Sequence, residues 1–86
     1  MSDYVYGLNK SGMSVIKLLN SQKKIFDCWD DNKKIRHLAN NHITKLNLKK
    51  INQKKINLYK NIYLTPGISL NDKRFKNISN YKIKRD

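Results

Sequence analysis

The chain has 86 residues and a net charge of +13, from 19 Lys and Arg against 6 Asp and Glu. This length allows one small domain with a modest core and excludes several domains within these residues. The single cysteine, Cys28, excludes a disulfide framework and a cysteine-based metal site, and it fits a reducing compartment. The sequence has no signal-peptide pattern and no apolar run of membrane-spanning length. These features predict a soluble, cytoplasmic protein.

The basic charge by itself suggests nucleic acid or an anionic surface as a partner. Its distribution argues against that partner. Lys, Asn and Ile recur along the whole chain, as A/T-rich codon usage produces, and Arg, the better base reader, occurs only three times. A small basic RNA- or ribosome-associated protein therefore remains as the alternative hypothesis, and it would bind with strong salt dependence.

The first predicted elements are a strand and a helix joined by a glycine turn. Residues 4–6 favour a strand, Gly7 and Gly12 follow, and apolar residues at helical spacing continue to Leu19. Strand, glycine turn and helix open nucleotide-binding βαβ units, where backbone approaches a phosphate and helix N–H groups face it. Ser11 is placed to cap the helix or to donate to a phosphate oxygen. An ordinary strand–turn–helix without a ligand is the alternative.

Residues 24–31 predict a second strand that ends in two adjacent carboxylates. Its apolar members are Ile25, Phe26, Cys28 and Trp29. Asp30 follows Gly12 by 18 residues, close to the interval at which βαβ units place an acidic residue that accepts hydrogen bonds from a ribose or base. Alternatively, Asp30 or Asp31 caps the next helix and favours its positive end. The two roles can coexist.

Residues 32–41 predict a second helix. Its apolar face consists of Ile35, Leu38 and Ala39. His37 and His42 lie five residues apart without a third ligand type at a useful position, so we expect no metal site.

The next two segments are less regular. Residues 43–48 predict a third strand with imperfect alternation, and residues 49–60 predict a loop with a short helix. The second segment is basic and carries Tyr59, which makes it the best local argument for RNA binding. A lysine-rich solvated face is the commoner explanation.

Residues 61–68 predict a fourth strand followed by an abrupt turn. The apolar run 62–64 is typical of a buried parallel strand. In the turn Thr65-Pro66-Gly67, proline restrains φ and glycine permits positive φ and close approach to a ligand. Ligands of open parallel sheets bind beyond the carboxyl ends of strands. We therefore expect these residues to share a rim with residues 7–12 and 30–32. A simple loop after a strand, without a ligand, is the alternative.

Residues 71–80 predict a fourth helix, with Phe75 and Ile78 apolar, and residues from 81 onward begin a fifth strand. A last strand without a following helix suggests a fragment of a longer protein. The fold class predicted from all elements is α/β, a Rossmann-like open parallel sheet of five strands with flanking helices.

Three motifs in this order resemble the N-terminal domain of Mur ligases. They are Gly-Leu-Asn-Lys-Ser-Gly-Met-Ser at 7–14, Trp-Asp-Asp-Asn at 29–32 and Leu-Thr-Pro-Gly-Ile at 64–68. The resemblance covers essentially the whole chain. It is closest to the branch that joins D-glutamate to UDP-N-acetylmuramoyl-L-alanine in peptidoglycan precursor synthesis, because Pro-Gly-Ile separates that branch from its sister ligases. A nicotinamide- or flavin-binding fragment, the third hypothesis, would show the first motif without the last.

The resemblance implies a domain that holds the UDP part of the substrate. The implied substrate-binding residues are Asn9, Lys10, Ser11, Gly12, Asp30, Asp31, Asn32, Thr65 and Gly67. Residues 9–11 would lie at the diphosphate, with Ser11 and backbone N–H groups as donors and Lys10 as a positive charge. Residues 30–32 would contact the uridine, Asp30 being the preferred acceptor, and Thr65 and Gly67 would line the opposite wall.

Two positions depart from the family pattern. Asn9 replaces a glycine; asparagine tolerates left-handed backbone, which would preserve the turn, but its side chain could crowd the diphosphate. Thr65 replaces a serine and keeps the hydroxyl group.

A phosphate loop of the type G-x-x-x-x-G-K-[ST] does not occur in the sequence. The resemblance places ATP, Mg²⁺ and the catalytic groups in a central domain, and further contacts in a C-terminal domain. Residues 1–86 are therefore expected to form a UDP-substrate-binding domain that has no catalytic, cofactor or metal site, is inactive alone and works with its own central and C-terminal domains.

Overall fold

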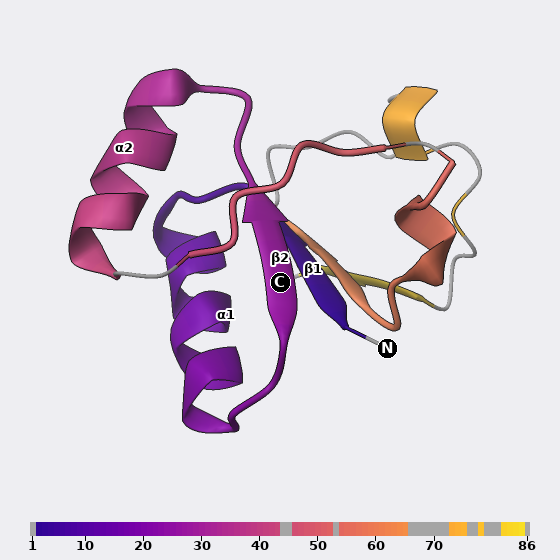
Figure 1. The fold of residues 1–86 in the computed structure, drawn as a ribbon, viewed down its shortest axis with the longest axis horizontal. Coiled ribbons are helices and arrows are strands. Elements are labelled where there is room, and N and C mark those ends of the chain that lie inside the picture. Colours follow the sequence, from indigo (N-terminus) through magenta and orange to yellow (C-terminus); the bar gives the residue numbers. More distant parts are fainter. Residues whose placement is uncertain are drawn as a thin grey trace.

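A four-stranded parallel sheet organises the computed structural model, which describes residues 2–43, 46–52, 54–65, 73–75, 78 and 82–85 (Figure 1). The strands are β1 (Asp3–Tyr6), β2 (Phe26–Trp29), β3 (Ile62–Leu64) and β4 (Ile83–Arg85). Their order in the sheet is β2-β1-β3-β4. The helices are α1 (Lys10–Ser21) and α2 (Lys33–His42), with short 3-10 helices η1 (Ile56–Leu58) and η2 (Lys73–Phe75).

The two faces of the sheet carry separate hydrophobic cores, because successive side chains of a strand point to opposite faces. Figure 1 shows α1 and α2 on the same side of the sheet. Val5 lies on the face that they cover and packs in a cluster with Ile16 and Cys28. Tyr4 and Tyr6 lie on the other face. Their cluster partners on that face are Ile56, Ile62, Leu64, Phe75 and Ile78. The domain therefore has a helical layer on one side and a layer of short turns and 3-10 helices on the other.

The first two predicted helices form as α1 and α2, with apolar faces that differ in part from the prediction. Ile16 and Leu19 of α1 are buried, as the helical spacing requires, whereas Leu18 is half exposed. In α2 only Ala39 is fully buried, and Leu38 is 51% exposed. Ile25 is 80% exposed and precedes β2, so the second strand is shorter than residues 24–31.

The predicted third strand at residues 43–48 is wrong. Ile43 is the C-cap residue of α2, and Leu48 makes only an isolated parallel bridge to Cys28. Two hydrogen bonds hold this bridge, from the Cys28 N–H to the Asn47 carbonyl at 3.1 Å and from the Lys49 N–H to the Cys28 carbonyl at 2.9 Å. The chain then leaves the sheet, since Asn and Lys are poor strand formers and the segment lacks an alternating apolar face. The described sheet consequently has four strands instead of five.

The remaining predictions concern the C-terminal half. The short helix expected within residues 49–60 is η1, the strand at 62–64 is β3, and the last strand is β4. Of the predicted helix 71–80, residues 73–75 form η2, a 3-10 helix, and Phe75 and Ile78 are buried as expected. Apart from Ile78, the other residues of that helix lie outside the described residues.

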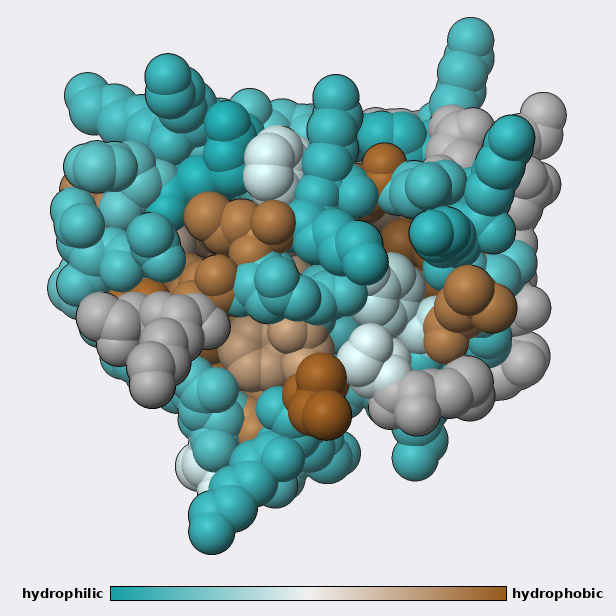
Figure 2. Space-filling view, in the orientation of Figure 1, coloured by the Kyte–Doolittle hydropathy of each residue, from teal (hydrophilic) through white to brown (hydrophobic). Residues whose placement is uncertain are grey.

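On the face shown in Figure 2, hydrophilic side chains cover most of the surface and apolar side chains show between them. Neither α-helix within the described ranges combines the length and the apolar composition that crossing a bilayer requires.

Candidate functional site

The carboxyl ends of β1 and β3 meet in a contact that requires glycine. Gly7 has φ +102°, in the left-handed region that residues with side chains rarely adopt. A Cβ atom at Gly7 would overlap the side chain of Thr65, and a Cβ atom at Gly12 would overlap the carbonyl group of Gly7. Both glycines of the predicted turn are thus required by packing, and α1 begins directly against the end of β1.

The first turn of α1 lies at this contact. Asn9 is its N-cap residue, with φ −74° and ψ −172°, and its side chain makes no capping hydrogen bond to the helix. The Asn9 backbone is therefore extended, and the turn does not depend on the tolerance of asparagine for left-handed backbone. Ser11 lies inside the first turn, so its predicted capping role is wrong. Because Met13 is the first residue to donate back, to the Asn9 carbonyl, the N–H groups of residues 10–12 have no intrahelical acceptor.

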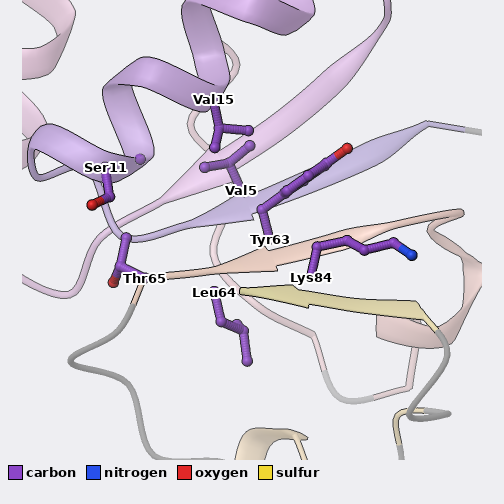
Figure 3. Close-up of a pocket in the computed structure, with 8 residues that line it drawn as sticks. Val5, Ser11, Val15, Tyr63, Leu64, Thr65 and Lys84 are labelled. Carbon is purple, nitrogen blue, oxygen red and sulfur yellow. The ribbon is translucent and has the colours of Figure 1, made fainter. Parts of the chain in front are cut away.

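Ser11 and Thr65 line a small hollow between α1 and β3, and Figure 3 shows them at the same end of it. The hollow has a volume of about 10 Å³, room for roughly one water molecule. The other labelled residues add apolar wall, except Lys84, whose side chain extends away from Thr65. A nucleotide does not fit inside this hollow. A ligand of that size would have to lie on the open rim, next to the start of α1.

Asp30 connects the two loops of the predicted rim. Its Oδ2 accepts a hydrogen bond from the Leu8 N–H, in the loop after β1, at 2.9 Å. Its Oδ1 accepts one from the Asn32 N–H, in the loop after β2, also at 2.9 Å. The Asp30 side chain therefore links two backbone segments by hydrogen bonds. A carboxylate offers about four lone-pair positions, so these two bonds leave acceptor capacity on Asp30.

Asp31 is held in an ion pair with Arg74 of η2. The Arg74 Nη1 atom lies 2.7 Å and 2.9 Å from the two carboxylate oxygens, and it also donates to the Tyr6 hydroxyl. Burial alone would raise the pKa of Asp31, but hydrogen bonds from Tyr6 and Arg74 and the charge of Arg74 lower the pKa below its ordinary value. The pair joins the end of β2 to η2 across the end of β1.

Asn32 caps α2. Its Oδ1 accepts hydrogen bonds from the N–H groups of Lys34 at 2.9 Å and Ile35 at 3.3 Å. The helix-capping role that the sequence left open for Asp30 or Asp31 therefore belongs to Asn32, whose side-chain oxygen is committed to the helix.

Arg36 fixes the same loop from the side of α2. Its Nη1 donates to the carbonyl groups of Asp30 at 2.7 Å and Asp31 at 3.1 Å, and its guanidinium carbon lies 4.2 Å from the centre of a Trp29 ring. This cation–π contact and the two hydrogen bonds hold the loop after β2 in one conformation.

Sequence reasoning missed both arginines. A signal for Arg36 existed, because a residue four positions after an N-cap lies over the first turn of the helix and can reach back to the loop. No local signal existed for Arg74, which is 43 residues from its partner Asp31. Of the predicted wall, Thr65 is in place against Gly7, and Pro66 and Gly67 lie outside the described residues.

Among the residues that the structure describes, no group of three His, Cys, Asp or Glu side chains is close enough to hold a metal ion. His37 and His42 are both exposed.

The comparison with protein families gives a match over residues 2–84, to the model described as Mur ligase MurD-like, N-terminal domain. The chain belongs to this family. The match extends through all three motifs, which confirms the resemblance to the N-terminal domain of Mur ligases. A search of curated proteins finds no match.

Membership of the Mur ligase family gives the rim a functional context. Mur ligases are ligases of peptidoglycan synthesis, and the matched region is their N-terminal domain. In this Mur ligase domain, the loop after β1, the loop after β2 and the end of β3 are joined by Asp30 and by the contact of Gly7 with Thr65. Substrate choice is a separate question from family membership.

Proposed function

We propose that this Mur ligase domain binds the UDP part of UDP-N-acetylmuramoyl-L-alanine, in an enzyme that joins D-glutamate to that substrate. The observation that carries the proposal is the close contact of Gly7, Gly12 and Thr65. It lies between β1 and β3, where the strand order β2-β1-β3-β4 reverses direction. Open parallel sheets bind ligands at such a switch point, beyond the carboxyl ends of the strands.

The start of α1 suits the diphosphate in this proposal. The N–H groups of residues 10–12 lack intrahelical acceptors, and the positive end of the helix dipole favours an anion there. Lys10 is exposed at the first helical position and adds a full positive charge. Ser11 adds a hydroxyl donor on the side that faces Thr65. Asn9 contributes its backbone and an exposed side chain.

The loop after β2 suits the uridine. Asp30 keeps acceptor capacity beyond its two backbone hydrogen bonds, so it is the side chain best able to accept from a ribose hydroxyl or from the base. Asp31 and Asn32 are engaged with Arg74 and with α2, and in the proposal they shape the pocket wall. Thr65, and Gly67 beyond the described residues, would form the wall opposite.

The proposal assigns binding alone to this chain. ATP and Mg²⁺ would act in a central domain and D-glutamate would be held with a C-terminal domain. In those domains the substrate carboxylate would take the γ-phosphoryl group of ATP with release of ADP, and the amine of D-glutamate would then displace phosphate from the acyl phosphate to form the amide. The cytoplasm, where ATP and UDP-linked precursors are present, is the location that this role requires.

Titration of the chain with UDP-N-acetylmuramoyl-L-alanine, followed by backbone amide NMR, tests the proposal. We expect shifts confined to residues 8–12, 30–32 and 65–68. Ser11→Ala should weaken binding by about tenfold or more, since one hydrogen bond to a charged group is lost. Ser14→Ala is the matched control, because that hydroxyl is exposed one turn later and donates to the Lys10 carbonyl, so affinity should stay unchanged. A folded spectrum that does not change at millimolar ligand would refute the proposed binding.

A further inference from the structure

A second and larger hollow lies on the sheet face that carries Tyr4 and Tyr6. It has a volume of about 290 Å³. We call it the lysine hollow, and the lining residues that matter are Asp27, Lys49, Lys50, Asn52, Lys55 and Tyr59. Ser2, just before β1, also lines it, so it opens near the amino end of the strands, whereas the rim lies at their carboxyl end. The rim does not use any of these residues.

The base of the lysine hollow is a closed polar network. Asp27 is only 8% exposed, and its two oxygens accept hydrogen bonds from the Tyr59 hydroxyl at 2.6 Å and from the Asn47 side-chain amide. Burial first, and then the neighbouring Asp27, raise the pKa of Tyr59, so its hydroxyl stays protonated and keeps donating. Because three lysines and one aspartate line the hollow, its net charge is positive and it is poorly suited to a cation.

The three lysines supply uncompensated positive charge. Within the described ranges, none of their ammonium groups forms an ion pair or a hydrogen bond with a protein group. Two of the lysines are anchored through their backbones. The Lys49 N–H donates to the Cys28 carbonyl and its carbonyl accepts from the Tyr4 hydroxyl. The Lys55 N–H donates to the Asn52 carbonyl, in the turn that starts η1. The backbone positions of two of the three lysines are thus held at the hollow.

We propose that the lysine hollow binds a small phosphate-bearing anion, independently of the rim. Three lysines against one aspartate favour a ligand with more than one negative charge, and lysine is a common point-charge partner of phosphate. A volume of about 290 Å³ is close to the lower end of the size range of small-molecule sites. This assignment uses the basic, tyrosine-bearing segment 49–60, which the Mur ligase function of the rim leaves without a role.

The test is a titration of the chain with sodium pyrophosphate at constant ionic strength, followed by backbone amide NMR. We expect shifts at Asp27, at residues 49–55 and at Tyr59, and none at residues 8–12. The triple variant Lys49→Gln, Lys50→Gln, Lys55→Gln should weaken binding by about tenfold or more, because several charge-assisted contacts are lost together. All three side chains are exposed, so the variant should remain folded.

The matched control is Lys23→Gln, Lys24→Gln, Lys60→Gln. These lysines line another hollow, of about 280 Å³, which also contains one aspartate but lacks a tyrosine. Equal losses of affinity in the two variants would overturn the proposal, because they would indicate attraction by net charge alone. Shifts confined to residues 8–12 would overturn it as well while supporting anion binding at the rim. Binding of single-stranded oligouridylate through residues 49–59 without any response to pyrophosphate would replace it with the RNA hypothesis.

Discussion

The absence of a side chain at Gly12 decides how closely α1 can approach the sheet. The first turn of α1 lies against the Gly7 carbonyl, and no Cβ atom fits between them. Position 7 requires glycine for two reasons: its φ is positive, and the Thr65 side chain occupies the space that a Cβ atom there would take. Asp30 then ties the Leu8 N–H to the neighbouring loop. At this scale the site consists of two glycines and one carboxylate that hold backbone in place.

Gly12→Ala should destabilise the protein by a net of about 2 kcal/mol. Overpacking against backbone costs roughly 1–3 kcal/mol or more, which outweighs the gain of about 1 kcal/mol in helix propensity. Urea denaturation followed by circular dichroism measures this change. Asn20→Ala, at an exposed position of the same helix, is the control and should leave stability equal or slightly higher. A Gly12→Ala protein as stable as the parent would contradict the packing argument.

The start of α2 is the element that fixes the loop after β2. Asn32 caps the helix, Arg36 bonds to the loop carbonyls and stacks on Trp29, and Asp30 receives the Asn32 N–H. Each contact comes from within one turn of the helix start. The helix start therefore fixes part of the loop geometry, and the distant contacts of Asp30 with Leu8 and of Asp31 with Arg74 add to it.

Removal of the cap by Asn32→Ala should lower the free energy of unfolding by about 1 kcal/mol, because two backbone N–H groups lose their acceptor. The measurement is the urea midpoint at constant denaturant slope. Asn40→Ala changes the same residue type at an exposed position within α2 and should have no destabilising effect. If the two variants behave alike, the capping contact does not stabilise the helix.

At the scale of the whole molecule, three tyrosines join the sheet to the layer of turns and 3-10 helices. The rings of Tyr4 and Tyr59 lie 4.8 Å apart between centres, and those of Tyr6 and Phe75 lie 5.4 Å apart. Burial, as the largest cause, raises the pKa of Tyr4, Tyr6 and Tyr59 above the ordinary tyrosine value. The folded protein therefore retains protons that the unfolded chain releases at a lower pH.

Stability should consequently fall as the pH rises above about 10, the pKa of tyrosine in an unfolded chain. Below that pH both states are protonated and the contribution is fully present; above it, only the unfolded state loses its protons. Urea midpoints measured from pH 8 to above about pH 11 test this dependence. Tyr59→Phe keeps the ring and removes one ionisable group, so the stability of this variant should fall less steeply with pH than that of the parent protein. Ionisation of Tyr4, Tyr6 or Tyr59 near pH 10 in the intact fold would contradict the expectation.

Local patterns predicted most of the elements. The glycine turn, both α-helices, β1, β2, β3, η1 and β4 follow from periodicity, glycine position and apolar runs. The errors lie where local preference is weak. Residues 43–48 lack clean alternation, and they form one bridge to Cys28 in place of a strand. How many of these residues pair with β2 depends on how long the chain runs alongside that strand, and local sequence does not encode this length.

The sequence by itself determined the family, most of the elements in their order and the three motifs, because these depend on residue type and short spacing. The tertiary structure alone decided the long-range contacts of the polar side chains. Asp30 turned out to accept a hydrogen bond from the Leu8 backbone, and Asp31 to pair with Arg74, a residue 43 positions away. Folding also gathered Lys49, Lys50 and Lys55 around Asp27 and Tyr59. Contacts between residues far apart in the chain arise from packing across the sheet, and short-range patterns carry no record of them.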